Sequence, residues 1–113
     1  MISKEKLIRT NKLFGERVTN PSSLDFDIIM ANKQKNIFRK LAYAIRPMTS
    51  AHAFSNANKR TALVMIKSEL ANEGIRCNQN KIAKSLIKLS DSAEGRINII
   101  ERRIRRACNK KLK

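Results

Sequence analysis

The sequence has no tryptophan, three glycines, two prolines and one histidine among 113 residues. Aromatic residues make up 4% of the chain, whereas the apolar set, dominated by Leu, Ile and Ala, makes up 42%. Few glycines and prolines leave few places for turns, and this apolar set favours helices over a sheet sandwich. We therefore predict an all-α fold, a compact bundle of about six helices in one domain, residues 1–113.

Cysteine is also scarce. Cys77 and Cys108 have neither metal-ligand spacing nor a histidine partner, so no zinc site is expected. Because cytosolic disulfides are rare, we predict two free thiols in a reducing compartment. No charged-then-apolar leader opens the chain, and no apolar run approaches the ~20 residues that cross a bilayer. The sequence thus predicts a cytoplasmic protein with no membrane partner.

Acidic residues are few: 9 Asp and Glu face 25 Lys and Arg, giving a formal net charge of +16. Such a surface attracts nucleic acid, nucleotides or an acidic protein partner. The charge alone does not choose among them.

Helical signals begin at Ser3, which can cap a helix that ends near Gly15. Asn20-Pro21-Ser22-Ser23 is typical of a turn, so we predict a loop up to Ser23 and a second helix from Leu24. The residues expected to face inward are Leu7, Ile8, Asn11 and Phe14 on the first helix and Phe26, Ile28, Ile29 and Met30 on the second.

Apolar spacing predicts a third helix that kinks or ends near Pro47 and leads into a turn over residues 49–54. A fourth, from about Asn58 to Glu73, stops at Gly74 and is apolar on much of its circumference, so we expect it at the centre of the bundle. Asn78 or Asn80 can cap a fifth helix, and residues 91–95 form a turn before the last. The expected core stripes are Ile37, Leu41, Ala44 or Ile45, and Met48; Ala62, Leu63, Ile66 and Leu70; Ile82, Leu86 and Leu89; and Ile97, Ile100, Ile104 and Cys108.

The stretch from His52 to Leu63 carries most of the chemistry. It places the only histidine, two carboxamides, a lysine and an arginine directly before an apolar helical run. The first turn of a helix has unpaired N–H groups and a partial positive charge, so it attracts anions. A histidine, with an ordinary pKa of about 6.5, can accept a proton from a hydroxyl at neutral pH. The pattern indicates phosphate chemistry.

The run His52-x-Phe54-x-x-Ala57-Asn58-Lys59-Arg60-Thr61-Ala62-Leu63 resembles the signature loop of the Fic/Doc family. Its tail from Lys59 to Leu63 is closer to the Doc (death-on-curing toxin) branch than to the AMP-transferring Fic branch. Ile2-Ser3, the Asn20-Pro21-Ser22 turn and the helix ending at Gly74 are also Doc-like, so the resemblance extends over most of the chain. It implies a Fic-like bundle with the motif helix central.

The resemblance also implies roles for the motif residues. His52 would be the general base that deprotonates the target hydroxyl, and Phe54 would bury its ring and fix the loop. The nucleotide's phosphates would be bound by Ala57, Asn58, Lys59 and Arg60.

Lys59 distinguishes the two branches. AMP-transferring Fic proteins have glycine at this position, whereas Doc-branch proteins have lysine and present the γ-phosphoryl group of ATP. Leu63 stands where Fic proteins carry a second arginine. Both residues favour an ATP-dependent protein Ser/Thr kinase over an AMP-transferring enzyme, which is kept as an alternative.

Asn56 departs from the family, which has Asp or Glu at this position to hold Mg²⁺. A carboxamide oxygen can coordinate magnesium, although without a charge it holds the hard cation less well. Either the metal is held mainly by the nucleotide, or this chain is catalytically impaired.

The resemblance thus implies a Doc-like toxin that uses ATP and Mg²⁺ to phosphorylate a Ser or Thr of a translation elongation factor. Its neutralising antitoxin would be a separate polypeptide. A second hypothesis is a catalytically impaired Fic-fold protein that binds nucleic acid or an acidic protein. The arginine-rich last helix is consistent either with a solvated face or with a surface for such a partner.

Overall fold

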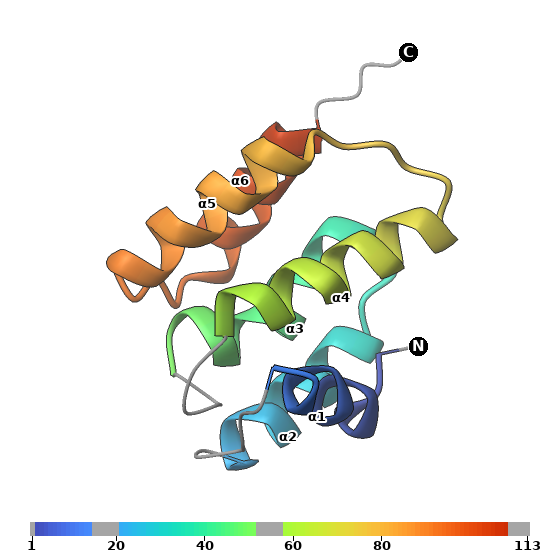
Figure 1. Cartoon of the computed structure of the whole chain (residues 1–113), viewed down its shortest axis with the longest axis vertical. Coiled ribbons are helices and arrows are strands. Elements are labelled where there is room, and N and C mark those ends of the chain that lie inside the picture. The colour runs from blue at the N-terminus through green and yellow to red at the C-terminus, as the bar shows by residue number, and fades with distance from the viewer. Residues whose placement is uncertain (1, 15–20, 52–57, 109–113) are drawn as a thin grey trace.

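Six α-helices form the described part of this computed structural model, which covers residues 2–14, 21–51 and 58–108 (Figure 1). They are α1 (Lys4–Lys12), α2 (Pro21–Asn32), α3 (Ile37–Thr49), α4 (Asn58–Asn72), α5 (Gln79–Asp91) and α6 (Ile97–Cys108). No strand occurs in these ranges. The prediction of an all-α bundle of about six helices is confirmed.

The helices are arranged around α3 and α4. Helix α3 contacts α2, α4, α5 and α6, whereas α4 contacts α1, α3 and α5. Figure 1 shows α5 and α6 at one end of the bundle, α1 and α2 at the other, and α3 and α4 between them. The expected central position of the fourth helix is confirmed, and α4 shares that position with α3.

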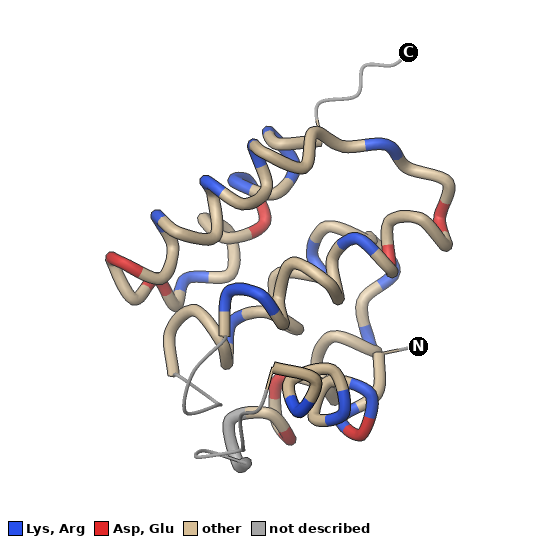
Figure 2. The backbone as a smooth tube through the Cα atoms, in the orientation of Figure 1, with Lys and Arg blue, Asp and Glu red and all other residues tan. Residues whose placement is uncertain are grey.

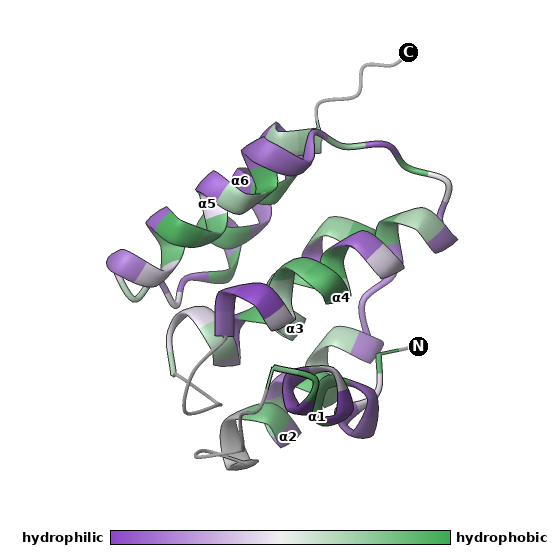
Figure 3. Cartoon of the chain, in the orientation of Figure 1, coloured by the Kyte–Doolittle hydropathy of each residue, from purple (hydrophilic) through white to green (hydrophobic). Residues whose placement is uncertain are grey.

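The core is continuous from α3 to the α5–α6 pair. Most of the expected core stripes are buried, and Figure 3 shows hydrophobic positions along the middle helices. The fully buried large side chains on these elements are Leu41, Ile45 and Met48 of α3, Ile66 of α4, Ile82, Leu86 and Leu89 of α5, and Ile100 and Ile104 of α6.

Helix α2 differs from the prediction at both its start and its buried face. It begins at Pro21 rather than Leu24, because a proline at the first helical position loses no hydrogen bond and has a suitable φ. The side chains of Phe26 and Ile29 are 59% and 57% exposed rather than buried. The buried stripe consists of Leu24, Asp27, Ile28 and Ala31.

Asp27 can lie in that buried stripe, although it is charged, because it pairs with Arg46. The Arg46 guanidinium of α3 donates to Asp27 from Nη2 at 2.6 Å to Oδ1 and from Nε at 3.1 Å to Oδ2. Arg46 Nη1 also donates to the carbonyl oxygen of Gly95 at 3.3 Å. The hydrogen bond to Asp27 raises the pKa of Arg46, despite its partial burial. Arg46 thus connects α2, α3 and the segment before α6.

Local signals account for most helix ends. The side chains of Ser3 and Asn78 accept hydrogen bonds from the backbone N–H groups of Lys6 and Lys81, as expected of N-caps. Helix α3 ends at Thr49, shortly after Pro47, as predicted.

Two helices are followed, two residues after their last residue, by a residue with positive φ. These residues are Gly74 (φ +72°) after α4 and Ala93 (φ +50°) after α5. At each end the next backbone N–H reaches back across the turn, from Ile75 to the carbonyl of Leu70 and from Glu94 to that of Leu89, both at 2.9 Å. Glycine adopts this conformation freely, whereas alanine does so only with strain.

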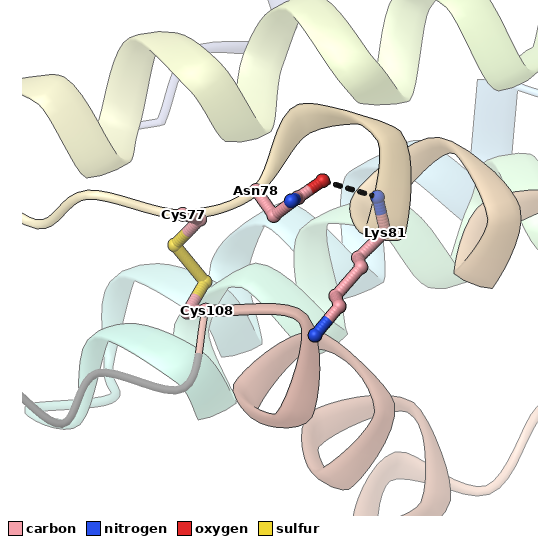
Figure 4. The surroundings of a disulfide bond; sticks show 4 residues. All are labelled: Cys77, Asn78, Lys81 and Cys108. Carbon is pink, nitrogen blue, oxygen red and sulfur yellow. Dashed lines mark hydrogen bonds between the residues drawn. A yellow bond between two sulfur atoms is a disulfide. The ribbon is translucent and has the colours of Figure 1, made fainter.

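The two cysteines are paired, which corrects the expectation of free thiols. Cys77 precedes α5, Cys108 ends α6, and a disulfide joins them across a sequence separation of 31 (Figure 4). The backbone N–H of Asn78 also donates to the carbonyl of Ala107 at 3.3 Å. The sequence did not reveal the pairing because it arises from the antiparallel packing of α5 and α6, which brings the start of one helix to the end of the other.

A methyl group should destabilise the protein at either positive-φ position. Adding one at Gly74 and removing the one at Ala93 should therefore change the free energy of unfolding in opposite directions. Gly74→Ala should lower the free energy of unfolding by about 1 kcal/mol, because the added Cβ strains the backbone. That Cβ would have no atom within 4 Å, so a steric clash does not contribute. Ala93→Gly should raise the free energy of unfolding by about 0.5–1 kcal/mol. Urea unfolding of both variants measures the effects, and a loss of stability in Ala93→Gly would contradict the argument.

Reduction of the disulfide should lower the free energy of unfolding by about 3–4 kcal/mol, because the closed loop restricts the unfolded chain. Thermal and urea unfolding with and without a reductant measure the change, and hydrogen exchange should locate the largest loss in α5 and α6. The Cys77→Ala/Cys108→Ala variant is the control, because the same reductant should leave its stability unchanged. Equal stability of the oxidised and reduced wild-type protein would show that the disulfide does not stabilise the fold.

Candidate functional site

The motif singled out in the sequence leads into the start of α4. Helix α4 begins at Asn58, so Asn58, Lys59 and Arg60 form its first turn. His52, Phe54, Asn56 and Ala57 lie outside the described residues, and their roles stay predictions. The described part of the candidate site therefore consists of the first turn of α4 and the side chains that pack against it.

The first turn of α4 has an unusual charge distribution. It contains no acidic residue, and Lys59 and Arg60 are both exposed there. The dipole favours anions at a helix start and disfavours cations by about 0.3–1 kcal/mol each at exposed positions. Two adjacent cations are thus unfavourable for the isolated helix. An anionic ligand at the helix start would reverse that effect, because it would be attracted by the side chains and the unpaired N–H groups alike.

Arg60 lies against an aromatic ring. Its guanidinium carbon is 5.7 Å from the centre of the Phe14 ring, which follows α1. A cation over a ring at this distance is stabilised by about 0.5–1 kcal/mol at an exposed site. The contact restricts the side chain without using its hydrogen-bond donors, so those donors remain suited to a planar arrangement of ligand oxygens.

The next residue, Thr61, anchors the first turn to α1. Asn11 Nδ2 donates to Thr61 Oγ1 at 3.0 Å, and both side chains are fully buried. A buried polar pair of this kind fixes the relative position of two elements, because neither group finds water if they separate. The sequence contained a signal for it: Asn11 is the polar member of the apolar stripe of α1.

A small hollow lies farther along the same interface. It has a volume of about 70 Å³ and a mostly apolar lining that includes Leu7 of α1 and Val64 and Met65 of α4. Sites for small molecules and cofactors typically measure about 300–1,000 Å³, so this hollow is too small for a nucleotide. A nucleotide at the start of α4 would have to lie outside it.

Residues 2–14, 21–51 and 58–108 contain no cluster of three or more His, Cys, Asp or Glu side chains that could hold a metal ion. The only residue predicted to contact Mg²⁺, Asn56, lies outside these ranges. Over the same part of the chain, no helix combines the length and apolarity needed to span a membrane.

Comparison with protein-family models, curated proteins and solved structures finds no match to this chain. The resemblance to the Fic/Doc family therefore depends on the motif residues themselves.

Thr61→Val should destabilise the protein by about 1–3 kcal/mol, because it removes the acceptor of a buried hydrogen bond and changes little in shape. Urea unfolding measures the loss. Thr10→Val on α1 is a matched control at a partly exposed position and should change stability by no more than about 0.5 kcal/mol. Equal effects of the two substitutions would show that the Asn11–Thr61 contact does not anchor α4.

Proposed function

We propose that this protein is a phosphotransferase of the Fic/Doc type, the toxin of a toxin–antitoxin pair. It transfers the γ-phosphoryl group of ATP to a Ser or Thr hydroxyl of a translation elongation factor. The observation that carries the proposal is the cationic first turn of α4, which lies within the motif that contains the single histidine.

The first turn of α4 supports phosphate binding in three ways. Its N–H groups and dipole attract an anion, and Lys59 adds a compact charge. The Arg60 guanidinium, already restricted by the Phe14 ring, can grip two phosphate oxygens. The buried Asn11–Thr61 contact fixes the turn against α1, so these groups are held in place before the ligand arrives.

In the proposed reaction, the target hydroxyl oxygen attacks the γ-phosphorus atom of ATP. His52 accepts the hydroxyl proton as the new O–P bond forms, which typically contributes about 10²–10⁴-fold in rate. The bond between the γ-phosphorus and the bridging oxygen breaks, and ADP leaves with its phosphates bound by Asn58, Lys59 and Arg60. Lys59, in place of the glycine of AMP-transferring proteins, favours this reaction over AMP transfer.

Asn56 determines how active the protein is. Mg²⁺ bound with ATP would neutralise phosphate charge, and the described residues supply no carboxylate cluster to hold it. Two states of the protein remain open in this proposal: a working enzyme whose magnesium is held mainly by ATP, or a chain impaired by the loss of the carboxylate.

The cellular setting is part of the same proposal. The target would be a cytoplasmic elongation factor, and a separate antitoxin polypeptide would neutralise the toxin. In a reducing cytoplasm the disulfide between Cys77 and Cys108 would be open. Activity should therefore be measured in both redox states.

The test is label transfer from [γ-³²P]ATP and, in parallel, [α-³²P]ATP to purified elongation factor with Mg²⁺. We expect label from γ-ATP only. His52→Ala should reduce the rate of label transfer by about 10²–10⁴-fold, because the proposed general base is lost. Asn56→Asp should increase the rate if the missing carboxylate is limiting, and Asn56→Gln is the matched control that restores no charge.

Label from α-ATP would assign the chain to the AMP-transferring class instead. Transfer that is not slowed by His52→Ala would remove the proposed base. If neither nucleotide labels the target, even with Asn56→Asp and the disulfide reduced, the phosphotransferase proposal fails.

A further inference from the structure

The helices α5 and α6 carry a set of cations that is separate from the first turn of α4. On their exposed sides stand Lys81, Lys84, Lys88, Arg102, Arg103 and Arg106, which we term the basic hairpin surface. The spacing of the three lysines, at i, i+3 and i+7, places them along one side of α5. Figure 2 shows blue positions repeated along both helices.

Two of the three acidic residues of the hairpin, Glu94 and Glu101, are paired with other cations, and the third, Asp91, forms no described ion pair. Glu94 accepts from the backbone N–H and Nε of Arg96, both at 2.9 Å, and these contacts lower the pKa of Glu94 to about 2. Glu101 is paired with Arg105 at 2.7 Å and with Arg39 at 3.2 Å. No described ion pair involves any of the six cations of the basic hairpin surface. Their charge is therefore not compensated within the described chain.

Uncompensated cations on two rigid helices are costly for the folded protein unless a polyanion binds them. From Lys81 to Lys88 the helix rises about 10 Å, whereas a nucleic-acid duplex presents a phosphate every ~3.4 Å along each strand. The three lysines can therefore reach different phosphates. The disulfide and the buried core of α5 and α6 hold the two rows of cations in a constant arrangement.

Two features of the hairpin limit the classes of partner that it can bind. Residues 79–108 contain no aromatic residue, so this surface offers no ring on which the bases of a single strand could stack. The apolar side of α6 is buried, with Ile100 and Ile104 no more than 1% exposed, so it cannot enter a lipid surface. On α5 the exposed large apolar side chain is Ile87, at 47%. The hairpin therefore offers a partner mainly charge, and the spacing of its lysines fits a duplex backbone.

We propose that the basic hairpin surface binds the phosphate backbone of a nucleic-acid duplex without reading its sequence. This activity lies beyond the phosphotransferase function and does not depend on it. The surface contacts phosphates through side-chain charge, so affinity should be governed by counterion release.

The test is fluorescence anisotropy of the full-length oxidised protein with 20-base-pair DNA and RNA duplexes from 50 to 200 mM salt. Affinity should fall by about 10³-fold over this range if all six cations contact phosphates. Lys81→Gln/Lys84→Gln/Lys88→Gln should weaken binding by about tenfold or more at 50 mM salt and reduce the slope of log affinity against log salt by about 2–3. Binding of DNA and RNA duplexes alike identifies the backbone as the ligand, and preference for one identifies that duplex.

The matched control is Lys6→Gln/Lys12→Gln/Lys35→Gln, which removes three exposed lysines outside the hairpin and changes the net charge equally. It should alter the salt slope by less than about 1. His52→Ala should bind the duplex as the wild type does, which separates this inference from the proposed enzyme activity. The proposal would be overturned by equal losses of duplex affinity in the two triple variants, or by no duplex binding at 50 mM salt. It would also be overturned if polyglutamate displaced the protein as well as a duplex does, or if the protein preferred phosphatidylserine vesicles.

Discussion

The ion pair between Asp27 and Arg46 is the constraint that orders the helices. A buried carboxylate is stable only when paired and hydrogen-bonded, so the stripe of α2 that contains Asp27, Leu24 and Ile28 can pack toward α3 only because Arg46 pairs with Asp27. With this stripe buried, Phe26 and Ile29 face solvent. Arg46 also binds the carbonyl of Gly95, so the same guanidinium holds the segment that leads into α6. One side chain of α3 thereby positions elements on both sides of it.

The two regions that we propose to bind anions lie on different parts of this frame. The first turn of α4 is exposed at one end of that helix, is fixed by Asn11 and Thr61, and depends on backbone N–H groups as well as on Lys59 and Arg60. The basic hairpin surface lies on α5 and α6 and depends on side-chain charge alone. A single, closely positioned anion suits the first region, whereas an extended polyanion suits the second.

Much of the fold could be predicted from local patterns. The caps Ser3 and Asn78, the stop at Gly74 and the stripe of Ile82, Leu86 and Leu89 depend on neighbours a few residues away, and they are found as expected. The start of α2 differs from the prediction because residues 20–23 match a turn pattern, whereas Pro21 also suits the first position of a helix. Within the candidate site, the first turn of α4 was predicted, but its contacts with Phe14 and Asn11 were not, because residues in α1 and α4 meet only after folding.

The sequence by itself determined the all-α class, most helix ends and the excess of positive charge, because these follow from residue type and from spacing within a turn or two. The tertiary structure decided which polar residues are buried, which apolar residues stay exposed and which cysteines meet. Asp27 is buried because Arg46 approaches from another helix, and Cys77 meets Cys108 because α5 and α6 are antiparallel. Such pairings depend on distances between segments that are remote in the chain, and no local pattern encodes them.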